Sequence, residues 1–233
     1  MGVSKRRKII LDKVDVMKIY ALQEAINLLK NLPKLKFNET VDISVNLGID
    51  VKKSDETVRG SSTLPHGIGK TSNVVVFAEG EDAIAAKKAG ADKVGFEDLI
   101  EEVKKNKDLD ADIVIASPDC MKLLGQLGRI LGPKNLMPNP KEGTVTKNIV
   151  QAVEKAKKGQ IRYKIDKAGI IHTTVGRLDF EEKKLAENIK TLVDDLNKAK
   201  PSSTKGKYMK NLTLSSTMGP GIKVDLSTIV ERT

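Results

Sequence analysis

Tryptophan is absent from the 233 residues, aromatic side chains make up only 3% of them, and there is a single cysteine. So few aromatic residues exclude a broad platform for base stacking, and a nucleic acid would be recognised mainly by its shape and backbone. The lone Cys120 excludes an internal disulfide and is typical of a reducing cytoplasm. Two distant histidines, His66 and His172, form no metal-binding cluster with it, so neither a metal nor a cofactor is predicted.

Long apolar runs are also missing. No stretch approaches the ~20 apolar residues that cross a bilayer, and the N-terminal MGVSKRRKII lacks the apolar core of a secretory signal. We therefore expect a cytoplasmic protein without a membrane-spanning segment. Positive charge, by contrast, is abundant, because 41 Lys and Arg oppose 31 Asp and Glu and give a formal net charge of +10. The excess favours a polyanionic partner, and the alternative is an acidic membrane surface bound by the basic stretch 5–8.

The positive charge is distributed unevenly. Residues 68–159 hold 15 Lys and Arg and 14 Asp and Glu, whereas the flanking segments together hold 26 and 17. The pattern of predicted elements changes near the same borders. We therefore predict two domains, a discontinuous one formed by residues 1–67 and 160–233 and a nearly neutral one, residues 68–159, inserted into it. The two connections between them would form a hinge.

The inserted segment alternates short apolar runs with amphipathic stretches, which predicts a three-layer, Rossmann-like α/β domain with parallel strands. Its strand-to-helix turns lack the glycines of a nucleotide-binding domain. The stretch LGPKNLMPNPKEGTV (131–145) has three prolines and predicts a fixed, self-packed loop. The expected strands are 74–78, 93–95 and 112–116, and the expected helices are 81–89, 98–105, 118–131 and 146–158.

The flanking segments have a different pattern, which predicts a split α+β domain with an antiparallel sheet and two helices on one face. The other face would be free for a partner. Residues 50–73 are polar and glycine-rich and are expected to be a loop. The expected helices are 15–32, with Asp15 as N-cap and Pro33 as the stop, and Asp179 to Lys198; the expected strands are 41–47, a hairpin of 161–165 and 170–175 around the turn 166–169, 212–217, and a last strand from 222.

The strand near the C-terminus suggests where a partner binds. Leu212 and Leu214 would point inward, and Thr213, Ser215 and Thr217 would line the solvent-facing side. The following Met-Gly-Pro-Gly turn has two glycines that permit positive φ and would leave backbone amides uncovered. Hydroxyls and free amides suit phosphate, sugar and 2′-OH groups. The alternative is an ordinary threonine-rich edge strand.

Two features that could indicate an enzyme are weak. The sequence Gly67–Thr71 ends in Gly-Lys-Thr, but Leu64 stands where a phosphate-binding loop needs glycine, and the loop precedes a strand instead of following one. Phosphotransfer at this loop remains the alternative from another functional class. The carboxylates Asp110, Asp112 and Asp119 flank a strand end and are expected to be a solvated rim, so no catalytic residue is predicted.

Five stretches together resemble the family of large-subunit ribosomal protein one, over essentially the whole chain. The resemblance implies a structural ribosomal protein, not an enzyme, whose split domain binds large-subunit rRNA in the mobile stalk of the large ribosomal subunit. It also implies a role in releasing deacylated tRNA at the exit site, repression of translation from its own operon mRNA, and a monomeric free protein. The stretches are KFNETVDISVNLGID (36–50), VRGSSTLPHGIGK (58–70), LGPKNLMPNPKEGTV (131–145), DKAGIIHTTVG (166–176) and STMGP (216–220), and SDETVRG (54–60) resembles the bacterial branch.

The same resemblance implies which residues bind RNA. Phe37 could alternatively be a residue at the edge of the core, and His172 a partly buried structural histidine. The stretch 131–145 is expected to be structural or a secondary contact. The implied RNA-binding residues are Lys36, Phe37, Thr40, Ser216, Thr217, Met218 and Gly219, and with a weaker match Asp166, Lys167 and His172.

Overall fold

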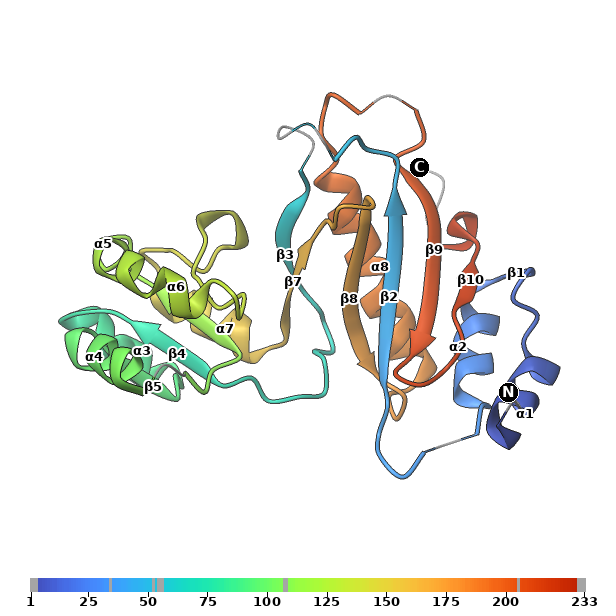
Figure 1. The fold of residues 1–233 in the computed structure, drawn as a ribbon, viewed down its shortest axis with the longest axis horizontal. Helices are drawn as coiled ribbons and strands as arrows, with labels where there is room; N and C mark the ends of the chain where they lie inside the picture. The colour runs from blue at the N-terminus through green and yellow to red at the C-terminus, as the bar shows by residue number, and fades with distance from the viewer. Residues whose placement is uncertain are drawn as a thin grey trace. The chain divides into compact units, whose positions relative to one another are not determined.

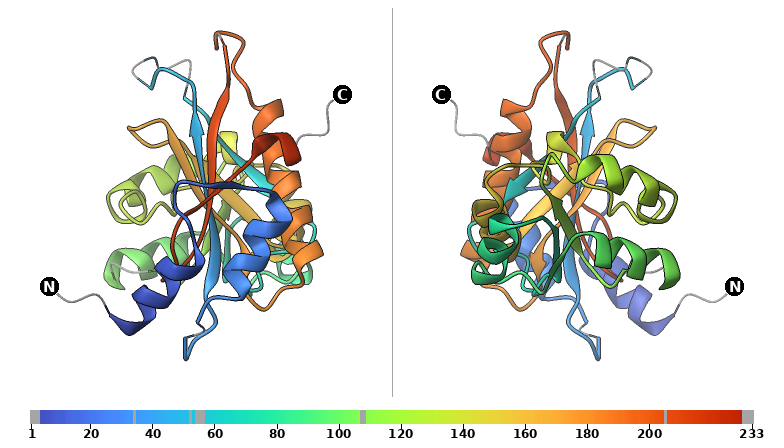
Figure 2. Two further views of the ribbon diagram at one scale, coloured as in Figure 1. Left: turned by 90° about the vertical axis from the view of Figure 1, so that its right-hand side faces the viewer. Right: turned by 90° about the vertical axis from the view of Figure 1, so that its left-hand side faces the viewer.

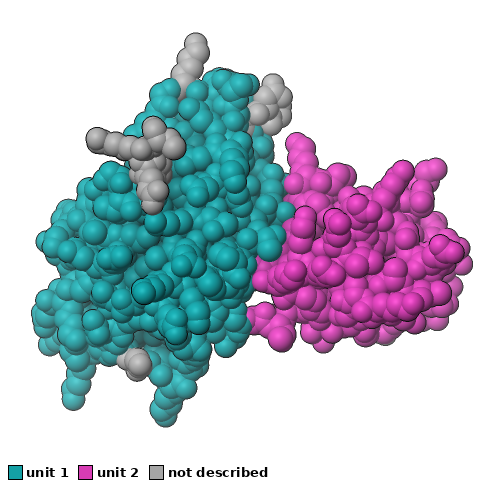
Figure 3. Space-filling view, turned by 180° about the vertical axis from the view of Figure 1, so that it is seen from behind, with its two compact units in different colours: residues 1–69, 161–233 teal, residues 70–160 magenta. Residues whose placement is uncertain are grey.

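The computed structural model describes residues 4–33, 35–51, 53, 57–106, 109–204 and 206–229. It divides into two compact units, and each is described here by itself. Unit 1 comprises residues 1–69 and 161–233, and unit 2 comprises residues 70–160 (Figure 3).

Unit 1 is built on a five-stranded sheet (Figure 1). All neighbouring strands are antiparallel except the first two, which are parallel, so the expectation of a wholly antiparallel sheet is corrected to a mixed one. β1 lies inside the segment 15–32, for which the sequence predicts a helix. The strands, in spatial order, are β1 (Ile19–Tyr20), β10 (Ile222–Val224), β9 (Met209–Ser216), β2 (Thr40–Leu47) and β8 (Ile170–Arg177).

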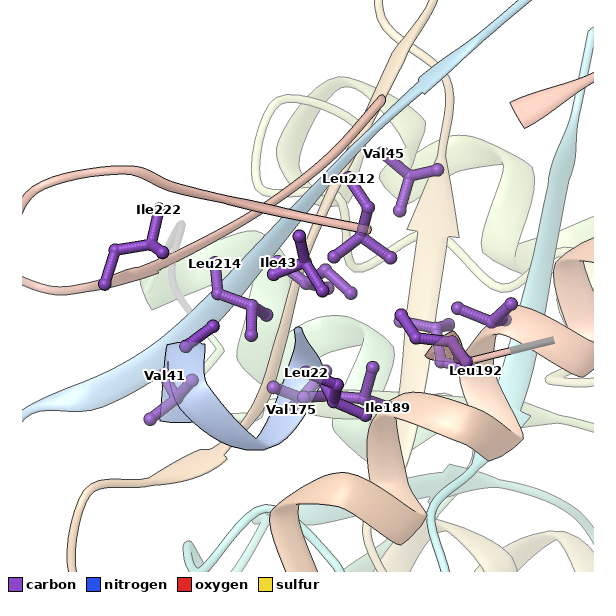
Figure 4. Packing of buried hydrophobic residues seen from close by; sticks show 14 of the residues in the cluster. Leu22, Val41, Ile43, Val45, Val175, Ile189, Leu192, Leu212, Leu214 and Ile222 are labelled. Atoms are coloured by element: carbon purple, nitrogen blue, oxygen red, sulfur yellow. The ribbon is translucent and has the colours of Figure 1, made fainter. Parts of the chain in front are cut away.

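Two amphipathic helices, α2 (Leu22–Lys30) and α8 (Glu182–Lys198), cover one face of this sheet, as the edge-on views of Figure 2 show. Alternate β2 residues are buried, which is the period of a strand with one face on a core. Each large aliphatic side chain buried in this way contributes roughly 1.5–3 kcal/mol. Figure 4 shows this packing for Leu22, Val41, Ile43, Val45, Val175, Ile189, Leu192, Leu212, Leu214 and Ile222.

The N-terminal region differs from expectation. The basic stretch 5–8, for which no helix was predicted, is the start of helix α1 (Lys5–Lys13), where the Ser4 hydroxyl accepts a hydrogen bond from the Arg7 amide at 3.3 Å. The helix predicted from Asp15 begins only at Leu22. Asp15 instead forms a local turn, because its carboxylate accepts the Met17 amide at 2.9 Å.

The predicted hairpin is also corrected. Its first strand, β7 (Gln160–Lys164), belongs to a separate two-stranded sheet with β3 (Arg59–Thr63), a strand inside the segment expected to be a loop. Only a single bridge joins Ile165 to Ile171 across the turn. α8 begins at Glu182, and Glu181 instead of Asp179 is its N-cap residue.

Unit 2 has a three-stranded parallel sheet, in the order β5 (Lys93–Gly95), β4 (Val74–Phe77) and β6 (Ile113–Ala116). Both faces of the sheet are buried, each in its own apolar cluster, so the unit has three layers. The predicted strands are confirmed. The predicted helix 118–131 is split into three short pieces. The helices are α3 (Glu81–Lys88) and α7 (Ile149–Lys157) in one cluster, and α4 (Glu97–Asn106), α5 (Met121–Leu124), the 3-10 turn Gly125–Leu127 and α6 (Gly128–Leu131) in the other.

Candidate nucleic-acid interface

The face of the five-stranded sheet opposite α2 and α8 is polar. β2 contributes its half-buried residues to this face, and the register places hydroxyl, amide and imidazole side chains of β8 and β9 beside them. Ser44, for example, lies between His172 and Thr213. The side chains on these three strands are Thr40, Asp42, Ser44, Asn46, His172, Thr174, Asn211, Thr213 and Ser215.

Hydrogen bonds across the strands hold these polar groups in place. The Thr174 hydroxyl donates to one Asp42 carboxylate oxygen at 2.7 Å, and the Thr40 hydroxyl donates to the other at 3.4 Å. Ser44 Oγ lies 3.0 Å from His172 Nδ1. Fixed donors and acceptors of this size can bond sugar hydroxyls and phosphate oxygens at short range.

The end of β9 is joined to the start of β2 at one edge of this face. The Thr217 amide donates to the Thr40 carbonyl at 3.2 Å, and the Thr40 amide donates to Thr217 Oγ1 at 3.1 Å. The two hydroxyl oxygens are 2.9 Å apart. Residues predicted from two distant motifs are therefore direct neighbours.

The Met-Gly-Pro-Gly turn, residues 218–221, was expected to leave its amides uncovered, and this is wrong for Met218 and Gly219. The Thr217 amide bonds Thr40, the Met218 amide donates to a Glu39 carboxylate oxygen at 3.0 Å, and the Gly219 amide donates to the Ser216 carbonyl at 3.0 Å. What this turn offers to a partner is its shape, the Thr217 hydroxyl and the Met218 side chain, which is 60% exposed.

Gly219 is required for a reason other than the one expected. Its φ is not positive, so conformational freedom is not the requirement. An added Cβ would instead collide with the Ser216 hydroxyl. Glycine at this position therefore permits close packing of the turn on Ser216.

Ser216, expected to contact RNA, is buried, and its hydroxyl donates to Glu39 at 2.7 Å. Glu39 is itself only 3% exposed and was not predicted as a site residue. The alternation of a strand could have identified both as buried. Glu39 is two residues before the buried Val41, and Ser216 is two residues after the buried Leu214, so each lies on the inward-facing side. A polar residue in phase with inward-facing residues is a buried polar residue.

Lys36 and Phe37 lie in the segment that leads into β2. The Phe37 ring is 53% exposed, which decides between the two interpretations of this residue in favour of a surface ring. It lines a hollow of about 600 Å³ together with Lys36, the end of α2 and Leu178. A cation and an exposed ring on one wall suit a phosphate and a ribose or base.

The remaining predicted residues lie towards the other end of the sheet. Asp166 accepts the Ala168 and Ile170 amides, each at 2.8 Å, and lies 3.4 Å from His172 Nε2. The Ile170 amide, followed by that of Ala168 and by His172, lowers the pKa of the Asp166 carboxyl. The Lys167 side chain is exposed at the tip of this turn. The His172 side chain is 59% exposed, which argues against the alternative of a partly buried structural histidine.

The predicted residues thus form two groups towards opposite ends of one sheet. Thr40 pairs with Arg177 and Asn46 pairs with Ile170, so six strand residues, or about 20 Å, separate the two ends. Asp42 and its partner Thr174 lie between the groups. A folded RNA, and not a small ligand, matches a surface of this length.

Features of other functional classes are explained by local structure. In the Gly67–Thr71 loop, Lys70 bonds the Asp112 carboxylate at 2.8 Å, and that carboxylate also accepts the Asn73 amide at 3.0 Å.

Among the described residues, no group of His, Cys, Asp and Glu could hold a metal ion. No helix in the described part of the chain is long and apolar enough to cross a membrane.

The stretch 131–145 is a self-packed loop, as predicted. Thr144 is buried, and its hydroxyl accepts the Asn139 amide at 2.7 Å and donates back to the Asn139 carbonyl at 3.1 Å. Leu136 is buried in a core cluster of unit 2. Much of this distinctive string is therefore explained by the packing of the loop.

Known proteins resemble this chain over most of its length. The family described as "Ribosomal protein L1p/L10e family" matches residues 28–220. A "Large ribosomal subunit protein uL1" from Psychrobacter sp. (strain PRwf-1) is 55% identical over 223 residues, 96% of this chain and 95% of that protein. A protein of the same name from Coxiella burnetii (strain Dugway 5J108-111) is 54% identical over 227 residues, 97% of each chain.

Proposed function

The chain belongs to the ribosomal protein L1p/L10e family, and we propose that it binds large-subunit rRNA through the polar face of its five-stranded sheet. Its family and relatives make it a structural protein of the large ribosomal subunit and not an enzyme. The proposal concerns the part of the surface that makes the contact and the way in which that surface recognises RNA.

The observation that supports the proposal is the Thr40–Thr217 pair beside the exposed Phe37 and Met218 side chains. Neutral hydroxyls in fixed positions discriminate by geometry, because they bond only groups presented at the right distance and angle. The exposed ring and thioether add apolar contact to a ribose or base. In RNA, the 2′-OH can both donate and accept, so it is the natural partner of a threonine hydroxyl.

Charge supplies a second, less specific contribution. Unit 1 holds 26 Lys and Arg against 17 Asp and Glu, whereas unit 2 is nearly neutral. Lys36 and Lys167 stand at the two ends of the polar face, where they can contact phosphates. Attraction of this kind releases counterions, and the resulting affinity falls steeply as the salt concentration rises.

We extend the proposal to two further partners. A surface that recognises shape and 2′-OH groups would also bind the protein's own operon mRNA where that mRNA folds like the rRNA site, and such binding would repress translation. A place in the mobile stalk and a role in releasing deacylated tRNA from the exit site are proposed on family resemblance alone.

The decisive experiment is chemical footprinting on large-subunit rRNA, with binding isotherms at several salt concentrations. We expect protection of one folded segment, and we expect Lys167→Ala to reduce the slope of log K against log[salt] by about 0.7–0.9. Lys88→Ala is the control, because Lys88 is exposed on α3 in unit 2. Diffuse protection, or equal effects of the two variants, would contradict a specific site on the sheet.

A further inference from the structure

Glu39, in the segment that leads into β2, is buried in unit 1 and bonds the 216–219 turn. Its side chain is 3% exposed. One carboxylate oxygen accepts the Ser216 hydroxyl at 2.7 Å and the Met218 amide at 3.0 Å, and the other accepts Arg6 Nη2 at 3.2 Å. A carboxylate has enough lone pairs for three donors, and this one uses them on the turn and on α1.

Arg6 bonds the same turn from a second direction. While Nη2 pairs with Glu39, Nη1 donates to the Met218 carbonyl at 3.2 Å. The Met218 backbone is therefore held at both its N–H and its C=O, and its side chain remains exposed. Arg6 therefore uses its charge and its donors for contacts inside unit 1.

We propose that Glu39 is a positioning residue for RNA binding. With Arg6 it fixes the 216–219 turn in its RNA-binding shape before RNA arrives, so that α1 belongs to the site through this link and not through a phosphate contact of Arg6. The inference rests on the proposed function. It adds that Glu39 and Arg6 hold the 216–219 turn in place.

The physical reason is preorganisation. A turn of small residues is mobile on its own, and ordering it on binding would reduce the affinity. Bonds to a buried charge are stronger than bonds between neutral groups, and the charge is tolerated because Arg6 neutralises it. Glutamine would be a poor substitute for Glu39, because its carbonyl oxygen could accept from Ser216 and Met218 but its NH₂ group would then face Arg6 Nη2, a donor that needs an acceptor.

Three variants test the arrangement, with one matched control. Glu39→Gln removes the charge and one acceptor, Ser216→Ala removes a single donor and is the milder change, and Arg6→Ala removes the second link. Lys8→Ala is the control, because it removes the same charge from an exposed position of α1. Circular dichroism confirms folding, amide hydrogen exchange of free protein reports on Met218, and rRNA affinity is measured against salt.

We expect Glu39→Gln to raise Kd about tenfold or more, with an unchanged salt slope and with faster exchange of the Met218 amide in the free protein. We expect Arg6→Ala to do the same, and the double variant to be no weaker than the worse single one, because both residues act on one turn. Ser216→Ala should give a smaller loss in the same direction, and Lys8→Ala should leave Met218 exchange unchanged.

Two results would overturn the inference. One is wild-type affinity and exchange in Glu39→Gln, or in Ser216→Ala if the first variant fails to fold. The other is a salt slope that falls by about 0.7–0.9 in Arg6→Ala, since that would make Arg6 a phosphate contact. Failure of the proposed function is a separate result, because wild-type protein that bound no rRNA would leave the exchange data on free protein intact.

Discussion

Thr40 and Thr217, 177 positions apart in the sequence, are joined by three hydrogen bonds of 2.9–3.2 Å. The pair fixes where β9 ends relative to where β2 begins. It also aligns the exposed hydroxyl of one residue with that of the other. Because the two hydroxyl oxygens are 2.9 Å apart, a partner group that bonds one of them also lies close to the other.

The first prediction concerns Thr217→Val, which keeps the shape of the side chain and removes its oxygen. We expect rRNA affinity to fall at least tenfold, because a hydrogen bond in a desolvated contact is lost. The fold should survive with a loss below ~1 kcal/mol, because Thr217 is exposed and water can replace it as the acceptor for the Thr40 amide. Thr217→Ser is the control and should restore most of the affinity. Unchanged affinity in Thr217→Val, measured by filter binding, would remove this residue from the site.

The second prediction concerns the exposed ring of Phe37. Stacking of an aromatic side chain on a base contributes roughly 1–3 kcal/mol, so Phe37→Ala should weaken rRNA binding about 5- to 150-fold. Stability should change little, because the ring is 53% exposed. Ile84→Ala is the matched control, since Ile84 is a 59% exposed apolar residue in unit 2. Equal affinities for the two variants in the same binding assay would exclude a contact by the ring.

The third prediction concerns Asn188, a fully buried amide on α8. It accepts the His66 amide at 3.2 Å and donates to the carbonyls of Gly67 and Val175 at 3.0 and 2.8 Å. Asn188→Leu leaves all three backbone groups without this partner, so we expect a loss of about 2–4 kcal/mol in the free energy of unfolding. Asn197→Leu, half-buried on the same helix, should cost far less. Similar urea midpoints for the two variants would show that the buried amide adds no stability.

The fourth prediction is a pH dependence within unit 2. Asp92 accepts Lys157 Nζ at 2.6 Å and the Val74 amide at 2.7 Å, and these bonds, that of Lys157 first, lower the pKa of the Asp92 carboxyl below 3.8. A lowered pKa in the folded state means that the stabilisation is present above about pH 3.8 and is lost as the pH falls through the folded-state pKa.

We therefore expect Asp92→Asn to destabilise unit 2 at pH 5 to 7, with a difference from wild type that disappears at lower pH. The NMR signals of β4 in urea measure this directly. Glu102→Gln is the control, because Glu102 pairs with Lys93 at 3.6 Å in a half-exposed position where ion pairs contribute little. A constant difference across the whole pH range would show that the charge of Asp92 has no role.

Local sequence patterns predicted the elements that depend on local forces. The alternation of 41–47 and the apolar runs of unit 2 gave the right strands, and Gly159, with φ of 96°, ends α7 as expected. Long-range pairings were not predictable in this way. Nothing in residues 59–63 indicates β7 as a partner, and the two residues of β1 are too short a run to show a period.

The candidate site was predicted only in part, for related reasons. Exposed residues in recognisable motifs, such as Phe37 and Thr217, were predicted as site residues and do lie at the surface, whereas Glu39 was not predicted. Helix α1 was missed because its first turn is basic and contains no acidic residue, which opposes the helix dipole. The long-range pairing of Arg6 with the Glu39 carboxylate, which offsets one of these cations, is not visible in the local sequence.

The position of β2 in the sheet has a consequence for synthesis of the chain. Both of its neighbours, β8 and β9, follow it by more than 120 residues. At roughly 5–20 residues per second, a newly made β2 waits about 6–25 s with both edges unpaired. During this interval the growing polypeptide offers a ready template for aggregation, so chaperone protection matters most before residue 170 emerges.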